Sequence, residues 1–403
     1  MPPPAVCGGR IIILPSLVNP YGTDVSMENE SLLMMPGPVP MPERVRLAMA
    51  RQAINHRGAE FGEIMDGLSV MLKEIFCTEN DVLLITGSGT AGMEAAISNF
   101  CRDRTVVSLA NGKFGDRLYR IAQRYTDRAT LLAAEDWGRP LPLTALETAL
   151  DEGVDVVTMV HNETSAGIMN PAEEVGKLAK KHGALFIMDG ITSIGADVVL
   201  PDKWGVDVAV MGSQKCLAAP AGLAGVSVSE KAWEMQCENP PFYFDLPAYK
   251  KNAAKLMTPY TPAVPLFLAL HEACKIVLEE GMEARITRHR MLAAACRAAV
   301  AEWGLEMYPT FDDLHAYSNT ATAVKYPEGI TDADVRGKVK SMGVEFAGGQ
   351  DHLKGRIFRI GTMGATNAPE LLGTLAMIQG ALSAAGCTPK GDGVSAACEV
   401  LFE

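Results

Sequence analysis

A glycine-rich turn is the first place where this chain could do chemistry. Residues 87–92 read Gly-Ser-Gly-Thr-Ala-Gly, follow an apolar run over 82–86 and precede a stretch with helical spacing. Backbone N–H groups at the start of a helix, with the helix dipole behind them, bind phosphate, and glycines let the anion approach closely. The same letters also fit the GxGxxG dinucleotide fingerprint, and many such turns are only structural. The turn therefore predicts an anion site without identifying its ligand.

Three charged residues stand in apolar surroundings further along the chain. Asp189 ends the run ALFIMD, where a strand-end carboxylate faces the ligand crevice of an α/β sheet or caps a turn. Lys215 follows the apolar run 206–212, and burial would make its amine nucleophilic, whereas an ordinary lysine reaches the surface. Arg359 lies inside RIFRIG and needs an anionic partner, either a structural carboxylate or a substrate.

A fifth polar segment, His-Asn-Glu-Thr-Ser over 161–165, follows the apolar run 154–160 and should reach the same edge of the sheet. An anion cradle, a strand-end acid and a desolvated lysine are the groups that pyridoxal phosphate requires. The lysine bonds the cofactor aldehyde, the acid pairs with its ring nitrogen and the cradle holds its phosphate. The combination predicts this cofactor more strongly than any motif does alone.

The elements that must position these groups alternate between strand and helix. Short apolar runs lie at 82–86, 105–110, 129–134, 154–160, 184–189, 206–212 and 223–229, and helical patterns separate most of the early ones. Continuous apolar strands alternating with helices are typical of a mostly parallel sheet covered on both faces. We expect an α/β fold, followed by long helices over 264–280 and 282–303.

Four segments are expected along the chain. Residues 1–30 form a flexible N-terminal extension, and 31–280 form a large cofactor-binding domain whose first residues pack on the small domain. Residues 281–386 mix short strands with helices and form a smaller α+β domain. Residues 387–403 show no clear period and are expected to be a loose tail.

Composition excludes several classes of protein. Lys and Arg number 36 against 48 Asp and Glu, so the net charge of −12 lacks the electrostatic footprint of a nucleic-acid binder. No apolar run approaches the roughly 18–20 residues of a membrane-spanning helix, and the first residues lack the shape of a signal peptide. Nine cysteines with no CxxC pair or zinc spacing indicate reduced thiols in a cytoplasmic protein.

Six stretches resemble the class V aminotransferases, enzymes of fold type I that depend on pyridoxal 5′-phosphate. They are MMPGPVPMPERV, TGSGTAGMEA, HNETSAGIMNP, MDGITSIG, WGVDVAVMGSQKCLAAPAGL and RIGTMG, and the resemblance runs from about residue 32 to 386. The chain looks most like the alanine–glyoxylate and serine–pyruvate group. That resemblance implies a homodimer with shared active sites. It also implies ping-pong transfer of an amino group from alanine or serine to glyoxylate or pyruvate.

The resemblance further implies roles around the cofactor ring. Lys215 would carry the cofactor covalently and move the substrate's α-proton, while Asp189 would pair with the ring nitrogen. Ile191 and Phe114 would pack against the two ring faces, and Thr164 would hydrogen-bond near the ring hydroxyl. Phe114 stands where relatives often have Trp, so stacking is kept and an N–H donor is lost.

The resemblance implies a second set of residues for the phosphate and the substrate. The phosphate ligands of the same chain would be Ser88, Gly89, Thr90 and Gln214, joined by Thr261 of the partner subunit. Arg359 would hold the substrate α-carboxylate, and Gly37 would line the substrate pocket. Relatives often have Tyr three residues before the threonine of the partner segment. Thr258 stands there and Tyr260 lies nearby, which leaves open which of them reaches the phosphate.

Other functions remain open at this stage. A different reaction on the same fold, such as a β-lyase or decarboxylase, uses the same core residues, whereas a cysteine desulfurase needs a cysteine that 297–386 lacks. A nicotinamide-dependent dehydrogenase would use the glycine-rich turn, but the following strand ends in Asn111 rather than an acid. A catalytically silent member of the fold would not be expected to keep Lys215, Asp189 and Arg359.

Overall fold

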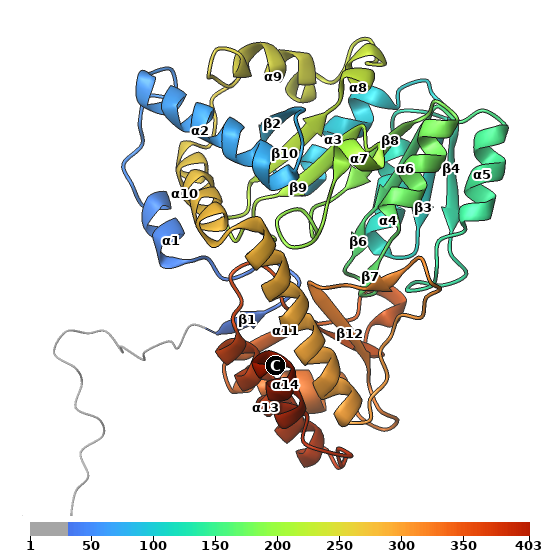
Figure 1. Cartoon of the computed structure of the whole chain (residues 1–403), viewed down its shortest axis with the longest axis vertical. Coiled ribbons are helices and arrows are strands. Elements are labelled where there is room, and N and C mark those ends of the chain that lie inside the picture. Colours follow the sequence, from blue (N-terminus) through green and yellow to red (C-terminus); the bar gives the residue numbers. More distant parts are fainter. Residues whose placement is uncertain (1–30) are drawn as a thin grey trace, which may run out of the picture.

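A seven-stranded sheet forms the centre of the computed structural model, which describes residues 31–403 (Figure 1). The flexible extension expected over 1–30 therefore lies outside the described residues. The strand order is β2 (Asp81–Thr86), β10 (Leu223–Val228), β9 (Val208–Gly212), β8 (Leu185–Asp189), β5 (Val156–Val160), β3 (Val106–Ala110) and β4 (Ala129–Ala133). β10 runs antiparallel to both neighbours, and all other pairs are parallel. The predicted α/β fold with a mostly parallel sheet is confirmed.

Helices cover both faces of this sheet. One face carries α2 (Ala59–Phe76), α5 (Leu143–Asp151), α6 (Ala172–Lys181) and α10 (Val264–Glu280). The other carries α3 (Gly89–Phe100), α4 (Lys113–Ala122), α8 (Glu230–Glu234) and α9 (Leu246–Ala253). Successive residues of β5 alternate between the two cores, because neighbouring strand side chains point to opposite faces. Both faces are covered, so the strand reads as one apolar run.

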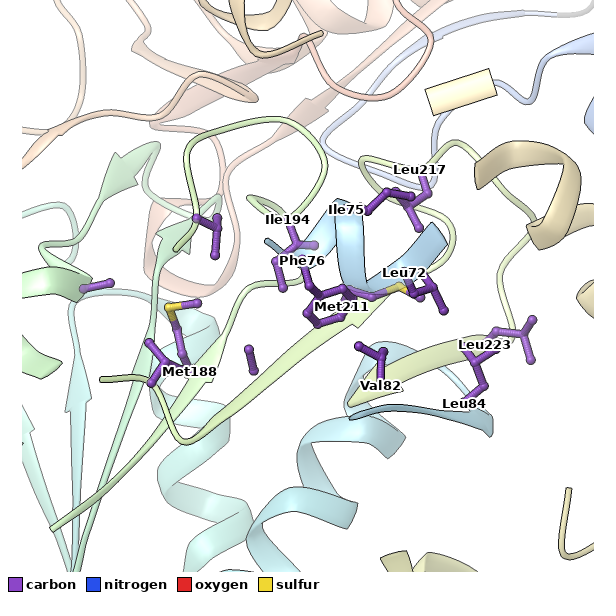
Figure 2. Packing of buried hydrophobic residues seen from close by; sticks show 14 of the residues in the cluster. Leu72, Ile75, Phe76, Val82, Leu84, Met188, Ile194, Met211, Leu217 and Leu223 are labelled. Atoms are coloured by element: carbon purple, nitrogen blue, oxygen red, sulfur yellow. The ribbon is translucent and has the colours of Figure 1, made fainter. Parts of the chain in front are cut away.

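The close packing on the first face is visible in Figure 2. Ile75 and Phe76 at the end of α2 lie beside Met211 of β9 within one cluster of buried side chains. Gly225 on β10 makes room for this contact, since a Cβ there would lie 2.9 Å from the Met211 terminal methyl carbon. The end of α2 is therefore fixed against the strand that leads into Lys215.

A second sheet collects strands from both ends of the described chain. Its order is β1 (Leu32–Met34), β13 (Val344–Gly348), β14 (Ile357–Gly361) and β12 (Ala321–Lys325), with β1 parallel to β13. The helices beside it are α11 (Met282–Glu302), α12 (Lys338–Ser341), α13 (Ala368–Ala384) and α14 (Gly393–Phe402). The long helices expected over 264–280 and 282–303 are confirmed as α10 and α11, whereas the domain boundaries stay a prediction.

Short elements join the two sheets. A three-stranded sheet pairs β6 (Asn162–Glu163) with β7 (Ile168–Met169), and β7 with β11 (Ala316–Tyr317). The remaining elements are α1 (Glu43–Met49), α7 (Pro201–Trp204), and single turns at Phe242–Phe244, Ala333–Gly337 and Asp351–Leu353. No helix within residues 31–403 is long and apolar enough to cross a membrane.

The prediction of a loose tail over 387–403 is wrong. Gly393–Phe402 forms α14, which lies along α11 and α13 and buries Ala397 completely. Asp392 caps its start by accepting a hydrogen bond from the Val394 N–H. A Cβ at Gly393 would lie 2.3 Å from Trp303 Nε1, so glycine permits the close approach to α11. Val394, Val400 and Leu401 pack on the same cluster as Ala397, and this helical spacing was overlooked in the sequence.

Candidate active site

A cavity of about 270 Å³ lies at the carboxyl ends of the central parallel strands. Eight of the residues predicted for the site line it together: Ser88, Gly89, Thr90, Phe114, Asp189, Ile191, Gln214 and Lys215. They lie at the end of β8 or in the turns and helix starts that follow β2, β3, β8 and β9, and these strands end at the same edge of the sheet. Ligands of open α/β sheets bind at this edge. The fold thus brings together side chains that lie far apart in the sequence.

Lys215 stands in the loop after β9 with its amine enclosed. Nζ donates hydrogen bonds to the carbonyl oxygens of Pro36, at 2.6 Å, and Gly37, at 3.4 Å. Burial lowers the pKa of Lys215 to about 8, so a large fraction of the amine is neutral near that pH. A neutral amine attacks a carbonyl, and the environment therefore suits a lysine that bonds an aldehyde.

Gly37 approaches this lysine closely. Its φ is +81°, and a Cβ there would lie 2.3 Å from Lys215 Cδ. Any side chain at position 37 would therefore move the lysine as well as strain the backbone. Gly37 does not line the cavity itself but bounds the space around Lys215.

Asp189 is the last residue of β8 and is 8% exposed. Burial raises the pKa of its carboxyl to about 7. The hydrogen bond that Oδ1 accepts from the Ile191 N–H, at 2.9 Å, acts in the opposite direction and lowers the pKa. A positive charge brought next to it, such as a protonated ring nitrogen, would lower that pKa and favour the ion pair. Asp189 can thus stabilise a cation in the cavity.

The glycine-rich turn begins α3 and fits a phosphate. Ser88 is the residue before the helix, and Gly89 and Thr90 are its first two residues, so their N–H groups point out of the helix end. A Cβ at Gly89 would lie 2.5 Å from Ile191 Cδ1, which leaves this backbone bare. The Gln214 side chain makes no hydrogen bond within residues 31–403, and its Oε1 is buried. Gln214 lines the cavity beside this helix start, where its amide N–H2 group could donate to the cofactor phosphate.

Arg359 lies on β14 and is 5% exposed. Nε and Nη2 donate to the Gly348 carbonyl at 3.0 and 2.8 Å, and Nη1 donates to the Thr164 carbonyl at 2.9 Å. Burial lowers the pKa of Arg359 to about 10. Within the described chain it forms no ion pair with a carboxylate, so the structural partner considered from sequence is not found. Its role as a substrate clamp stays a prediction.

Two other predicted residues lie away from the cavity lining. Thr164 is buried and contacts Arg359 through its backbone carbonyl, whereas Asn162 of the same segment reaches the cavity. Thr261 is exposed at the surface, where a partner subunit could contact it. The roles assigned to both residues stay predictions.

Two further residues shape the site. Glu163 belongs to the polar segment 161–165 that the sequence singled out, although no role was given to it, and Arg117 was missed by sequence reasoning. Glu163 is fully buried, and its carboxylate accepts hydrogen bonds from the N–H groups of Phe114, Gly115 and Ser165. Burial raises the pKa of Glu163, and these hydrogen bonds oppose that shift. The carboxylate thereby fixes the start of α4 and the ring of Phe114. Arg117, one helical turn beyond Phe114, also lines the cavity.

The comparison with protein families decides between the open functions. The family model described as "Aminotransferase class-V" matches residues 44–358. The chain belongs to the class V aminotransferases. It is therefore a transaminase of fold type I that depends on pyridoxal 5′-phosphate, and the nicotinamide-dependent dehydrogenase is excluded.

Similar proteins span nearly the whole of this class V aminotransferase. An uncharacterized aminotransferase of Methanocaldococcus jannaschii is 46% identical, over 93% of this chain and 98% of that protein. The L-aspartate–glyoxylate aminotransferase of Paracoccus denitrificans is 34% identical, over 93% and 96%. The crystal structure of ureidoglycine–glyoxylate aminotransferase from Bacillus subtilis superposes with a TM-score of 0.87 at 31% identity, over 93% and 98%.

Proposed function

We propose that this aminotransferase moves the amino group of a small neutral amino acid, alanine or serine, to glyoxylate or pyruvate. The observation that carries the proposal is the cavity shared by Lys215, Asp189 and the glycine-rich turn. The relatives from Paracoccus and Bacillus are named for transfer to glyoxylate from different donors, which supports glyoxylate as the acceptor. The donor must therefore be argued from the site.

The arginines of the site support a neutral donor. Arg359 is the guanidinium we assign to the substrate α-carboxylate, which it can hold with two parallel hydrogen bonds. Arg359 is not among the residues that line the described cavity. The arginine that does line it, Arg117, donates a hydrogen bond to Thr90 in the glycine-rich turn. No further arginine lines the described cavity, so a second substrate carboxylate would be left without a bidentate partner.

Each residue has a defined task in the proposed reaction. The cofactor, when bound, supplies an electron sink for the negative charge that develops at the amino acid's α-carbon. Lys215, once released by the incoming amino group, takes the α-proton as general base and returns it as general acid. Its lowered pKa of about 8 suits both directions of that transfer. Asp189 keeps the ring nitrogen protonated by its negative charge.

Two flanking side chains orient the ring. Ile191 and Phe114 line the cavity, and the carboxylate of Glu163 holds the backbone of Phe114. With the cofactor bound, these two side chains would pack against its ring and limit its motion.

A substrate screen tests the proposal. The purified holoenzyme is supplied with each of twenty amino acids, aspartate included, against glyoxylate, pyruvate and 2-oxoglutarate, and the new amino acid is measured by chromatography. We expect the highest kcat/KM with alanine or serine and with glyoxylate or pyruvate. A preference for glutamate with 2-oxoglutarate would refute the assignment, and ammonia release without a new amino acid would indicate a lyase.

We also propose a homodimer in which Thr261 reaches the phosphate of the partner subunit. Phe242 is 81% exposed and lies against Tyr260, so aromatic surface is gathered beside Thr261. The Thr258 hydroxyl donates to the Tyr260 carbonyl, which occupies it within its own chain. Light scattering coupled to size exclusion should give twice the chain mass of 43.1 kDa. Replacing Phe242 by Glu should shift that mass toward the monomer.

We further propose that the enzyme works in the cytoplasm. The eight cysteines within residues 31–403 are all free, and free thiols are typical of reducing compartments. Cell fractionation followed by immunodetection tests this assignment, and recovery from a secreted fraction would contradict it.

A further inference from the structure

The geometry points to Arg117 as the cation that binds the cofactor phosphate within the same chain. This assignment rests on the cofactor of the family and does not depend on which amino acid is the donor. Phosphates and carboxylates are both oxyanions, and a guanidinium can hold two oxygens of either group at once.

Arg117 is placed by α4 at the phosphate end of the cavity. Its Nη1 donates a hydrogen bond of 3.2 Å to the hydroxyl of Thr90, the second residue of α3. Its guanidinium carbon lies 4.9 Å from the centre of the Phe114 ring, one helical turn earlier. The stacking and the hydrogen bond together aim the cation toward the N–H groups at the start of α3.

The charge balance of the cavity requires such a cation. Its lining holds three charged side chains, Arg117, Asp189 and Lys215. A phosphate monoester carries about −1.5 to −2 charges at pH 7, whereas a helix start supplies roughly half a positive charge. Lys215 is committed to the cofactor aldehyde and Asp189 is negative. Arg117 is thus the cation left to balance the phosphate.

Arg117 is also free to take this role. It forms no ion pair with any carboxylate of residues 31–403, and its hydroxyl partner is neutral. The neighbouring Lys113, by contrast, pairs with Asp351 at 3.0 Å. Asp189 in the same cavity interacts with Arg117 through electrostatics but forms no ion pair with it. The guanidinium therefore has no hydrogen-bonded carboxylate and can bind an anion that arrives with the ligand.

A second oxyanion could in principle use the same cation, namely the side-chain carboxylate of a dicarboxylic substrate. The hydrogen bond to Thr90 favours the phosphate, because Thr90 belongs to the helix start that faces it. Two measurements distinguish the cofactor phosphate from a substrate carboxylate as the anion that Arg117 binds.

The first measurement compares pyridoxine 5′-phosphate with pyridoxine on the full-length chain freed of cofactor. Neither compound has an aldehyde, so Lys215 cannot bond to it, and the two differ only in the phosphate. We expect Arg117→Ala to weaken binding of the phosphorylated compound about 10- to 100-fold, the value of a charge-assisted hydrogen bond. Pyridoxine should bind with unchanged affinity, and Arg117→Lys should recover part of the loss.

Arg120→Ala is the matched control, because this substitution removes the same charge from an exposed position on the same helix. It should change neither affinity, and circular dichroism should show that all variants are folded. Equal weakening of both compounds, or of neither, overturns the assignment.

The second measurement uses the holoenzyme. A bound guanidinium keeps the phosphate dianionic, so its ³¹P resonance should be independent of pH in the parent enzyme and titrate in Arg117→Ala. If the resonance is unaffected while the KM for aspartate alone rises, the cation serves a substrate carboxylate and the assignment is wrong.

Discussion

Lys215 Nζ lies 2.6 Å from the carbonyl oxygen of Pro36, to which it donates a hydrogen bond across 179 positions of the sequence. Pro36 follows β1, whose pairing with β13 fixes this segment to the second sheet. A Cβ at Gly361 would lie 2.2 Å from the Met35 carbonyl oxygen, so the segment also packs tightly on the end of β14. The second sheet therefore helps to set the position of the Lys215 amine.

The lowered pKa of Lys215 predicts how cofactor uptake depends on pH. Burial moves the pKa from an ordinary 10.5 to about 8, so the neutral, nucleophilic amine predominates above pH 8. The rate of pyridoxal phosphate incorporation into cofactor-free enzyme should rise with pH around a midpoint near 8. Stopped-flow absorbance measures that rate. Lys215→Ala should bind the cofactor without a linkage that borohydride can fix, and a midpoint near 10 would contradict the prediction.

Replacing Asp189 by Asn should lower activity while keeping the fold. The amide oxygen can still accept the hydrogen bond from the Ile191 N–H, whereas the negative charge beside the ring nitrogen is lost. We expect kcat to fall about 100- to 1000-fold, the usual effect of removing one preorganised electrostatic group. Steady-state kinetics measures it, with unchanged thermal unfolding as evidence of folding. An Asn variant with parental kcat would exclude the ion pair with the ring nitrogen.

Arg359→Gln should weaken binding of the substrate rather than binding of the cofactor. Losing a charged, bidentate partner of the α-carboxylate should lower kcat/KM about 10- to 100-fold, mainly through KM. Arg356→Gln is the control, because this exposed residue stands just before the same strand. Kinetics with alanine and an independent titration of cofactor affinity separate the two effects. A loss of cofactor affinity with unchanged KM would show that the clamp is misassigned.

Arg285 should be a main contributor to the stability of the loop that carries Lys215. This side chain is 3% exposed and donates to the carbonyls of Gly195, Cys216 and Gly364 while pairing with Glu280. Arg285→Ala would leave the carbonyls of Gly195 and Cys216 without this donor, whereas Arg288 would still bind Glu280 and the Gly364 carbonyl. We expect a cost of about 3–5 kcal/mol in the free energy of unfolding, because two buried acceptors lose their partner.

Urea unfolding of the holoenzyme measures this cost. The comparison is Arg51→Ala, which breaks an ion pair with Glu60 that is exposed on both sides and should cost about 1 kcal/mol or less. Similar losses in the two variants would show that burial of the Arg285 network adds nothing.

The C-terminal helix should be required for the packing of the second sheet's helices. Ala397 on α14 is completely buried against them, so Ala397→Asp would bury an unpaired carboxylate. We expect a lower Tm and aggregation on heating, measured by scanning fluorimetry. Ser383→Asp places the same charge at an exposed position on the neighbouring α13 and should leave the Tm within a few degrees. A parental Tm in Ala397→Asp would mean that α14 contributes no stability.

The features of the fold and of the site that could be predicted are those that a short stretch of sequence reveals by itself. The apolar runs marked the strands of the central sheet because strands covered on both faces carry apolar side chains at every position. Lys215 and Asp189 were visible as charged residues at the ends of such runs. Arg117 was not, because its position depends on how α4 packs beside α3, and an arginine in a polar helix carries no local signal.

The sequence by itself determined the family, the cofactor and the alternating order of strands and helices, since each is written in local motifs and apolar patterns. The tertiary structure alone decided that β1 pairs with β13, that α14 is packed, and that Arg117 meets Thr90. These are contacts between distant segments, and their free energy depends on shape and charge complementarity that no single stretch of sequence contains.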